Sequence, residues 1–245
     1  MKTKLKILKV FLGLVILGVL VGFSVRKNAC RKVESLKVII EHQKNNYFLN
    51  DSIVKNIIEE DGQPIMDTPI GNLDVYEMEK KINESPYVDT AQVSKDIYGN
   101  IHVNIEQKEP IARVNTAKDE FYITTDGKRM PISKVYSAPV IMVAGDVKEE
   151  DYVGLSDLIQ YINTDNLLKN HIIGIQKVGQ RSYNLIVNKG NYYIELGTLY
   201  NFEKKLKNLK LFYDQYLGNV GLDYYKKISI KFINQVVATK TNENE

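Results

Sequence analysis

The sequence predicts an α+β protein with a single N-terminal transmembrane helix, a small β-α-α-β-β domain and a β-rich domain with helices. Three features of the 245-residue chain indicate this. An uncharged apolar run stands near the start, helical and alternating patterns follow up to residue 107, and strand patterns dominate afterwards. The expected parts are a short cytoplasmic segment at 1–9, the transmembrane helix at 10–25, the small domain at 33–107, the β-rich domain at 108–240 and a polar tail at 241–245.

The composition points away from several function classes. The net charge of +3 is too small to indicate nucleic-acid binding. Cys30 is the single cysteine, so no internal disulfide can form, and the three histidines are too far apart for a local metal-ligand spacing. Nucleotide-binding and hydrolase motifs are absent from the sequence. We therefore expect no catalytic residues, no metal, no cofactor and no nucleic-acid partner.

Val10–Val25, VFLGLVILGVLVGFSV, is the strongest compositional signal. A bilayer span takes about 20 apolar residues, and lysines near a helix end can reach the headgroups, so the run is just long enough. A cleaved signal peptide is the alternative, but Lys27 stands where cleavage before Cys30 would need a small residue. Basic residues flank both ends of the run. The short head and the long tail therefore decide the expected orientation, with a cytoplasmic N-terminus and extracytoplasmic domains.

Gly18 and Gly22 form a GxxxG spacing inside this helix. The spacing lets two helices approach closely, but it also arises by chance in apolar segments. Weak self-association through these glycines and a chance spacing therefore both stay open.

The small domain is expected to begin with a strand and a helix. Ser35–Glu41, SLKVIIE, is a short apolar run with β-branched residues, which is typical of a strand. Asp51 or Ser52 is the expected N-cap of the helix. An apolar stripe at helical spacing follows: Ile53, Val54, Ile57 and Ile58.

A second helix and a hairpin complete this domain. Asp74 followed by Glu77 resembles a capping box, and the helix must end before Pro86. Two alternating runs then flank Gly99-Asn100, which is a hairpin-turn pattern. The expected order is strand, helix, helix, strand, strand, with both helices on one face of the sheet.

Strand patterns dominate from Ile111 onward, in the runs FYIT, APVIMVAG, HIIGIQKV, YNLIVNKG and YYIELG. Gly154–Ile162 has helical spacing, and so does the apolar and aromatic stripe of Phe202–Tyr216. Lys227–Lys240 is the expected last strand. The solvent-exposed face of the Phe202–Tyr216 helix is expected to carry Lys204, Lys205, Lys207 and Lys210.

Several stretches resemble the bacterial cell-division family FtsQ/DivIB. SLKVIIE with its capped helix resembles the start of a POTRA domain, and residues 71–114 resemble the rest of it. YITTDGKRMPI resembles the opening of the family's β domain, and residues 196–237 resemble its closing helix and last strand. The central match rests on Pro86, Tyr87, Val88, Ala91, Val93, Glu106, Lys108, Pro110 and Ala112.

Val103–Val114, VNIEQKEPIARV, then looks like the exit from the POTRA sheet into the β domain. Pro110 is expected to stop ladder pairing and to stiffen this junction. A catalytic role for Glu106 and Glu109 would need a buried pair with separated pKa values, and the sequence does not indicate one.

The resemblance implies a non-enzymatic scaffold of the divisome in the bacterial inner membrane, concentrated at the division septum. Its β domain would bind FtsB (DivIC) and FtsL, which are single-span proteins, and so couple septal wall synthesis to cell division. In the family a strand of FtsB adds to the last strand of the β domain, where main-chain hydrogen bonds supply affinity.

By position in the motif, the partner-binding residues would be Ile230, Lys231, Phe232, Val236 and Val237. Phe232 stands where the family usually has Tyr, and Lys231 where it has Arg, although lysine cannot form a bidentate fork. Alternatively, Ile230, Phe232 and Val237 are ordinary core residues, because alternation would put Ile230 and Phe232 on one face.

The resemblance also implies a recruitment surface on the POTRA strand, at Thr90, Gln92 and Ser94, for which a plain solvated face is an equal alternative. Two other functions stay open. A POTRA module for translocation or assembly usually has several repeats and a membrane barrel, which this sequence lacks. An anchored extracytoplasmic enzyme would need a catalytic site assembled from distant residues.

Overall fold

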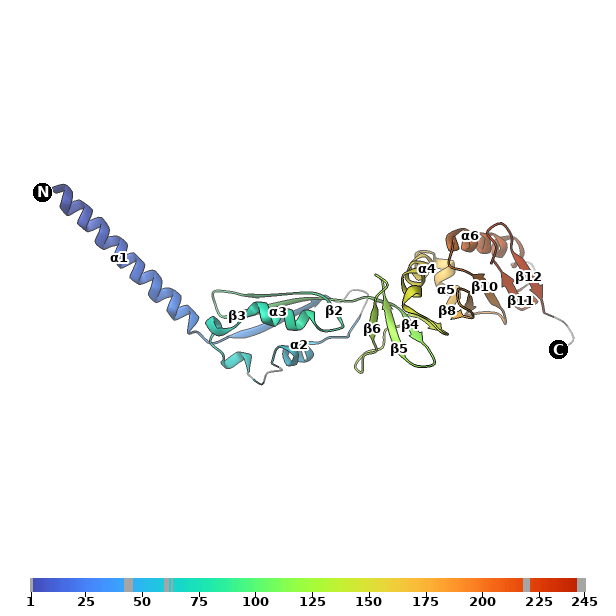
Figure 1. The fold of residues 1–245 in the computed structure, drawn as a ribbon, viewed down its shortest axis with the longest axis horizontal. Coiled ribbons are helices and arrows are strands. Elements are labelled where there is room, and N and C mark those ends of the chain that lie inside the picture. Colours follow the sequence, from blue (N-terminus) through green and yellow to red (C-terminus); the bar gives the residue numbers. More distant parts are fainter. Residues whose placement is uncertain (1, 42–45, 60–61, 63, 218–220, 242–245) are drawn as a thin grey trace. The chain divides into compact units, whose positions relative to one another are not determined.

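A computed structural model describes residues 2–41, 46–59, 62, 64–217 and 221–241. The chain divides into two compact units, Met1–Lys108 and Glu109–Glu245, whose elements are drawn in Figure 1. Each unit has its own hydrophobic core. Residue 1 of the predicted cytoplasmic segment and residues 242–245 of the predicted polar tail lie outside the described residues. The finer boundaries of the five predicted parts stay predictions.

Helix α1, Lys2–Ala29, contains the predicted helix at 10–25. Its side chains from Phe11 to Val25 are exposed. In the part of the chain that the structure describes, no helix has both the length and the apolar character needed to cross a membrane. A helix over residues 10–25 is confirmed, and its assignment as a transmembrane helix is not.

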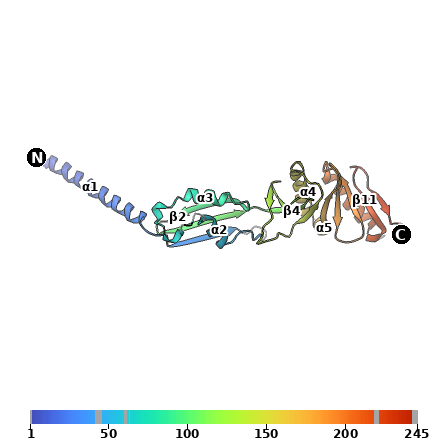
Figure 2. The same ribbon diagram turned by 60° about the horizontal axis from the view of Figure 1, so that its bottom comes forward.

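The first unit has the predicted β-α-α-β-β order. Strand β1 (Ser35–Glu41) is parallel to β3 (Asn100–Gln107), and β2 (Val88–Lys95) is antiparallel on the other side of β3. The sheet order is therefore β1-β3-β2. Helices α2 (Asp51–Ile58) and α3 (Val75–Asn83) lie against the sheet (Figure 2). They bury Val54, Met78 and Ile82 in its core.

Side chains cap both of these helices. Asn50 Oδ1 accepts a hydrogen bond from Ile53 N–H at 2.9 Å, so the expected cap at Asp51 or Ser52 is wrong. Asp51 is instead the first helical residue, where an acidic side chain complements the helix dipole. Asp74 caps α3 as predicted, because its carboxylate accepts from the N–H groups of Tyr76 and Glu77.

Side chains from α3 close the outer edge of β2. Ala91 N–H donates to Asn83 Oδ1 at 2.9 Å, and Asn83 Nδ2 donates to Ala91 O at 3.3 Å. Val93 N–H donates to Glu79 Oε2 at 2.9 Å. These are the backbone groups that an added strand would use. Another strand could therefore pair with β2 only by displacing both side chains.

The second unit is built on a nine-stranded sheet with the order β12-β11-β10-β9-β8-β7-β4-β5-β6. Helices connect two of its parallel pairs, β7–β8 and β10–β11, as a parallel crossover requires. The helices are α4 (Tyr152–Thr164), α5 (Asn166–His171) and α6 (Phe202–Phe212). The strands are β4 (Pro110–Asn115), β5 (Glu120–Thr124), β6 (Arg129–Pro131), β7 (Ile141–Ala144), β8 (Ile172–Lys177), β9 (Tyr183–Val187), β10 (Tyr193–Gly197), β11 (Tyr225–Ser229) and β12 (Val237–Lys240).

The α+β class is confirmed, with a β-rich second domain that contains helices, but the expectation for Pro110 is wrong. Pro110 does not stop ladder pairing: it is the first residue of β4 and lies opposite Thr124 of β5, a position that a proline tolerates. The strand expected in HIIGIQKV is confirmed as β8, which begins at Ile172 because α5 ends at His171. The side chain of Asp165 caps α5 by accepting from the N–H groups of Leu167 and Leu168.

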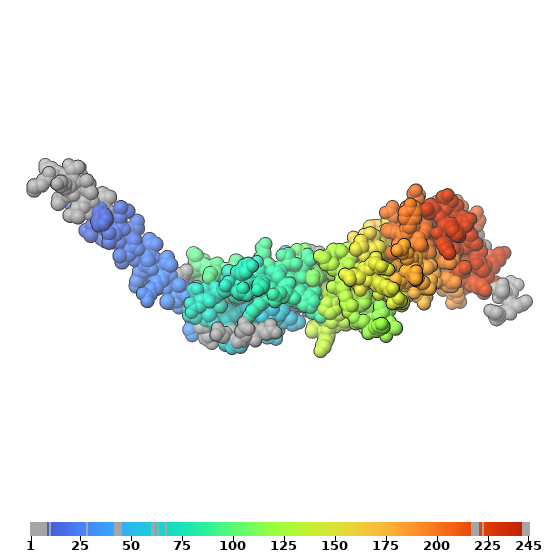
Figure 3. Space-filling model, in the orientation of Figure 1, coloured from blue at the N-terminus to red at the C-terminus, as the bar shows by residue number. Residues whose placement is uncertain are grey.

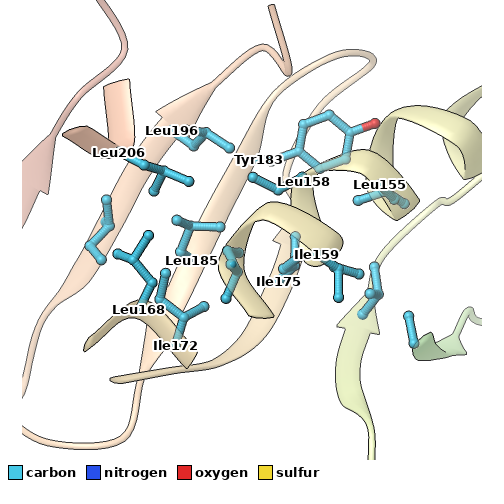
Figure 4. Close-up of a cluster of buried hydrophobic side chains, with 14 of the residues drawn as sticks. Leu155, Leu158, Ile159, Leu168, Ile172, Ile175, Tyr183, Leu185, Leu196 and Leu206 are labelled. Carbon is cyan, nitrogen blue, oxygen red and sulfur yellow. The ribbon is translucent and has the colours of Figure 1, made fainter. Parts of the chain in front are cut away.

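The core of the second unit lies between the helices and the sheet (Figure 4). Leu155 and Leu158 of α4 are fully buried, as are Leu206 of α6 and the strand residues Leu185 and Leu196. The buried sides of these strands alternate with half-exposed residues, which is the pattern of a sheet covered on one face.

A buried ion pair joins the start of α4 to strands β8 and β9. Lys177 Nζ donates to Asp151 Oδ2 at 2.5 Å, and Tyr183 OH donates to Asp151 Oδ1 at 2.6 Å. All three residues are buried. Burial raises the pKa of the Asp151 carboxyl, but the hydrogen bonds from Lys177 and Tyr183 outweigh this and hold the pKa below its ordinary value. The carboxylate therefore stays charged inside the domain.

Replacing Lys177 by methionine leaves the Asp151 carboxylate buried without its cation. We expect the free energy of unfolding, measured by urea denaturation of the full chain, to fall by about 3 kcal/mol. The double variant D151N/K177M removes both charges and should lose clearly less, since removing a whole buried pair is often nearly neutral. A double variant as unstable as K177M alone would contradict this account of the ion pair.

Candidate functional site at the C-terminal sheet edge

The C-terminal end of the large sheet is formed by β10, α6, β11 and β12. Strand β11 is parallel to β10 and reaches it through the crossover helix α6, and β12 folds back antiparallel to β11. β12 is thus the last strand of the sheet within the described residues. We call its outer side the C-terminal edge.

The structure does not contain the single strand that was expected over Lys227–Lys240. β11 ends at Ser229, a turn follows, and β12 begins at Val237. The turn contains Asn234, a residue type that favours turns because its side chain can hydrogen-bond the local backbone. The expected alternation of faces consequently stops at Ser229.

Within the described residues, no strand pairs with the C-terminal edge, which exposes the outer backbone of β12. Thr241 N–H donates to Tyr224 O at 3.0 Å, so Thr241 belongs to a hydrogen-bonded pair between β12 and the chain that leads into β11. Backbone groups alternate between the two sides of a strand. Thr239 therefore also bonds toward β11, whereas Ala238 and Lys240 turn their N–H and C=O groups outward.

Lys205 fixes α6 to the end of β10. Its Nζ donates to Leu196 O at 3.2 Å and to Thr198 O at 2.7 Å, and the residue is only 2 % exposed. Burial lowers the pKa of the Lys205 ammonium. The expectation that Lys205 lies on the solvent-exposed face of the helix is therefore wrong. Lys205 is three residues after Phe202 and lies on the face that packs toward the sheet.

Two further side chains of α6 bind neighbouring segments of the chain. Lys210 forms an ion pair with Asp165, and hydrogen bonding to Lys210 holds the pKa of the Asp165 carboxyl below its ordinary value. Asn208 Nδ2 donates to Ile233 O, which ties the turn between β11 and β12 to the helix. Lys204 and Lys207 are exposed, as predicted.

A groove of about 690 Å³ lies beside the start of β12. In the space-filling view the orange surface of α6 borders the red surface of the C-terminal strands (Figure 3). Phe212 and Tyr216 stack in the groove wall with ring centroids 5.5 Å apart. The lining residues are Lys204, Lys207, Asn208, Leu211, Phe212, Gln215, Tyr216, Ile233, Asn234, Gln235 and Val236.

The five residues predicted for partner binding lie in different environments. Ile230 is fully buried, and its N–H donates to Glu195 O, so it belongs to the core. Lys231 and Phe232 are exposed in the turn, with the Lys231 ammonium 5.9 Å from the Phe232 ring centroid. Val236 is half-buried in the groove, and Val237 is the exposed first residue of β12. Of the five residues, Val237 lies on β12, Val236 lies just before it, and Lys231 and Phe232 lie in the turn after β11. Their role in partner binding stays a prediction.

The other predicted positions lie in the first unit. Thr90, Gln92 and Ser94 are exposed on β2, on the side of the sheet opposite the buried Ala91 and Val93. Gly18 and Gly22 are exposed on α1, and no heavy atom lies within 4 Å of a Cβ built on either residue. The roles assigned to these residues stay predictions.

Sequence reasoning missed Lys205, Asn208 and the groove. The signal for Lys205 was its spacing from Phe202 and Leu209, three and four residues away on one helix face. Asn208 carried no signal, because its hydrogen bond to Ile233 depends on where the turn lies.

The family described as FtsQ/DivIB, C-terminal related, matches residues 109–239, which is more than half of the chain. The chain belongs to this FtsQ/DivIB-related family. Residues 28–106 match the family described as POTRA-like domain. Both matches confirm the predicted resemblance, and the second unit corresponds to the C-terminal domain of the FtsQ/DivIB-related family.

Among solved structures, the chain is similar to the major extracytoplasmic domain of the trans isomer of the bacterial cell-division protein DivIB from Geobacillus stearothermophilus. The identity is 15 %, the match covers 46 % of this chain and 97 % of that chain, and the TM-score is 0.32. No curated protein sequence matches the chain.

Among the described residues of this FtsQ/DivIB-related chain, no three or more His, Cys, Asp or Glu side chains are placed so that they could hold a metal ion.

The buried Lys205 predicts a pH dependence of stability. Because its pKa is lowered in the folded state, the unfolded chain binds more protons between that lowered value and about 10.4. Stability from this group therefore rises with pH across that window. We expect the difference in unfolding free energy between the wild type and Lys205→Met to grow from about pH 7 to about pH 10.

The matched control is Lys204→Met, because Lys204 is exposed on the same helix turn. Its difference from the wild type should stay constant over the same pH range. Equal pH profiles for K205M and K204M would show that Lys205 titrates normally in the folded protein.

Proposed function

We propose that the chain is a non-catalytic scaffold of the bacterial division machinery that binds FtsB/DivIC-like and FtsL-like proteins at the C-terminal edge. One observation carries the proposal: within the described residues the sheet ends in an open strand, β12, at the end of the region that matches the FtsQ/DivIB-related family. Such a scaffold concentrates at the division septum and links septal wall synthesis to cell division.

The mode of binding follows from the backbone of β12. An extended partner segment adds to the sheet through the outward N–H and C=O groups of Ala238 and Lys240, which supply affinity that does not depend on side chains. Val237 is 50 % exposed and Phe232 is 59 % exposed. Both side chains can therefore contact a partner without any rearrangement of the core. Exposed aromatic residues such as Phe232 are a kind of side chain that often contributes much of the binding energy of an interface.

Lys231 is a further residue that could contact the partner. Its side chain lies over Gly197, where an added Cβ would come within 2.8 Å of Lys231 Cγ. Gly197 has a φ of +70°, which glycine adopts without strain. This glycine therefore leaves room for the lysine stem at the end of β10, and the ammonium is available for an acidic group of the partner.

An alternative, a POTRA module for translocation or assembly, draws on the first unit alone. The C-terminal family match favours the division scaffold, since it covers the unit that such a module lacks.

Ala238→Pro tests the strand-addition mode. Proline removes the outward N–H of residue 238, while Val237 and Thr239 keep their pairing with β11. We expect the affinity of the full chain for a labelled FtsB/DivIC-like segment, measured by fluorescence anisotropy, to fall by at least about tenfold. Ala238→Ser keeps the N–H and should bind like the wild type. Equal affinity for A238P and A238S, with both folded by circular dichroism, would place the partner elsewhere.

Phe232 and Ile230 form a second matched pair. Phe232→Ala removes an exposed ring, so stability should change by less than about 0.5 kcal/mol, while affinity for the partner segment should fall by at least about 1 kcal/mol. Ile230→Ala opens a cavity in the core and should cost about 2–5 kcal/mol of unfolding free energy. The measurements are urea denaturation and partner titration. Unchanged partner affinity of F232A would remove Phe232 from the site.

A further inference from the structure

The second open edge of the chain belongs to the small sheet and runs along β1. Within the described residues, no strand pairs with the outer side of β1. In Figure 2 the blue β1 lies along one side of this sheet. The opposite edge, at β2, is closed by Asn83 and Glu79. Strand addition in this domain is therefore possible on the β1 side without displacing side chains.

The side chains of β1 show that this edge is incompletely covered. Leu36, Val38 and Ile40 face the core but are only half-buried, whereas their partners on β3 in the parallel register are at most 1 % exposed. On the other face Lys37, Ile39 and Glu41 are exposed, and Ile39 is 57 % exposed. A further strand beside β1 would shield the half-buried residues and Ile39 together.

The hydrogen bonds of β3 tell which backbone groups of β1 point outward. Asp96 N–H donates to Asn100 O at 3.0 Å, so Asn100 and every second residue after it bond toward β2. Val103 and Ile105 therefore bond toward β1. In a parallel pair the register partners of such residues face away. These partners, Val38 and Ile40, consequently turn their N–H and C=O groups to the open side.

The exposed face of β1 is complementary to itself. When two β1 strands lie antiparallel with Ile39 opposite Ile39, Lys37 of each copy lies opposite Glu41 of the other. Val38 then lies opposite Ile40, so the outward backbone groups of both strands meet in hydrogen-bonded pairs. Ile39, Lys37 and Glu41 fall in the non-hydrogen-bonded pairs, in which side chains are closest. Backbone, apolar contact and charge therefore agree on one register.

We propose that β1 pairs antiparallel with β1 of a second copy of this chain, in the register centred on Ile39. The contact is isologous, as in a two-fold symmetric dimer, and joins two three-stranded sheets into one six-stranded sheet. In this register five residues of each β1 strand, 37–41, lie opposite one another. They bury less than the about 1,000 Å² of a stable interface, so the pair is weak in dilute solution. It forms where copies of the chain are concentrated, and it is independent of the C-terminal edge.

Disulfide trapping in the full chain tests the register. Cys30 is exposed, so the background is Cys30→Ser. In a non-hydrogen-bonded pair the Cα atoms are about 4.5 Å apart, which lies within the range that a disulfide spans. Ile39→Cys should therefore form a covalent dimer under diamide, seen on a non-reducing gel, at least about tenfold faster than Gln92→Cys. Gln92 is exposed on the same face at the closed β2 edge.

Lys37→Cys supplies the sharper control. In the proposed register two copies of residue 37 are about 14 Å apart, so K37C alone should not cross-link. A mixture of K37C and Glu41→Cys should form the mixed dimer. Ile39→Cys no faster than Gln92→Cys would overturn the proposal. Self-linking of K37C as fast as the mixture would overturn it as well.

Charge reversal checks the contact without new cysteines at the charged positions. In the Ile39→Cys background, Lys37→Glu should slow dimer formation because it places two acids opposite each other. Adding Glu41→Lys should restore the rate. A double variant as slow as the single one would show that the charges do not pair across the interface, and the register would be rejected.

Discussion

The C-terminal half of the large sheet depends on the buried ammonium of Lys205. This group holds α6 against the carbonyls at the end of β10, and α6 is the crossover that lets β11 lie parallel to β10. Because one side of β11 is paired with β10, β12 can pair only with its other side. β12 therefore becomes the edge strand. Dehydrating the charge of Lys205 costs free energy, and burial lowers its pKa for the same reason. The hydrogen bonds to the two carbonyls offset part of this cost and fix the position of α6.

The two units handle their strand edges in different ways. In the small sheet, Asn83 and Glu79 occupy the backbone groups of β2, and β1 carries a lysine and a glutamate around one exposed isoleucine. In the large sheet, the C-terminal edge is only four residues long and is bordered by a groove beneath α6. Short or charged edges resist indiscriminate pairing and still accept a matching strand.

Periodicity predicted the parts of the fold that depend on local sequence. The β-α-α-β-β order follows from SLKVIIE, the Asp74 cap and the Gly99-Asn100 turn, because each is decided within a few residues. The turn after Ser229 was missed, since Ile230 and Phe232 keep an apolar alternation although the chain has left the strand. The burial of Lys205 and the capping of β2 by Asn83 depend on contacts between elements, which a local pattern does not contain. The alternative that Ile230, Phe232 and Val237 are core residues is correct for Ile230, which is buried, and wrong for Phe232 and Val237, which are exposed.

The closure of β2 by α3 also limits how far the small sheet can grow. A sheet with two open edges can add copies on both sides and lengthen into a fibre. Here the β2 edge is closed by the amide of Asn83 and the carboxylate of Glu79. When two copies pair through β1, both outer edges of the joined sheet are closed β2 strands. Assembly through this domain is therefore terminated after one step, and crowding many copies at one place does not by itself lead to polymerisation.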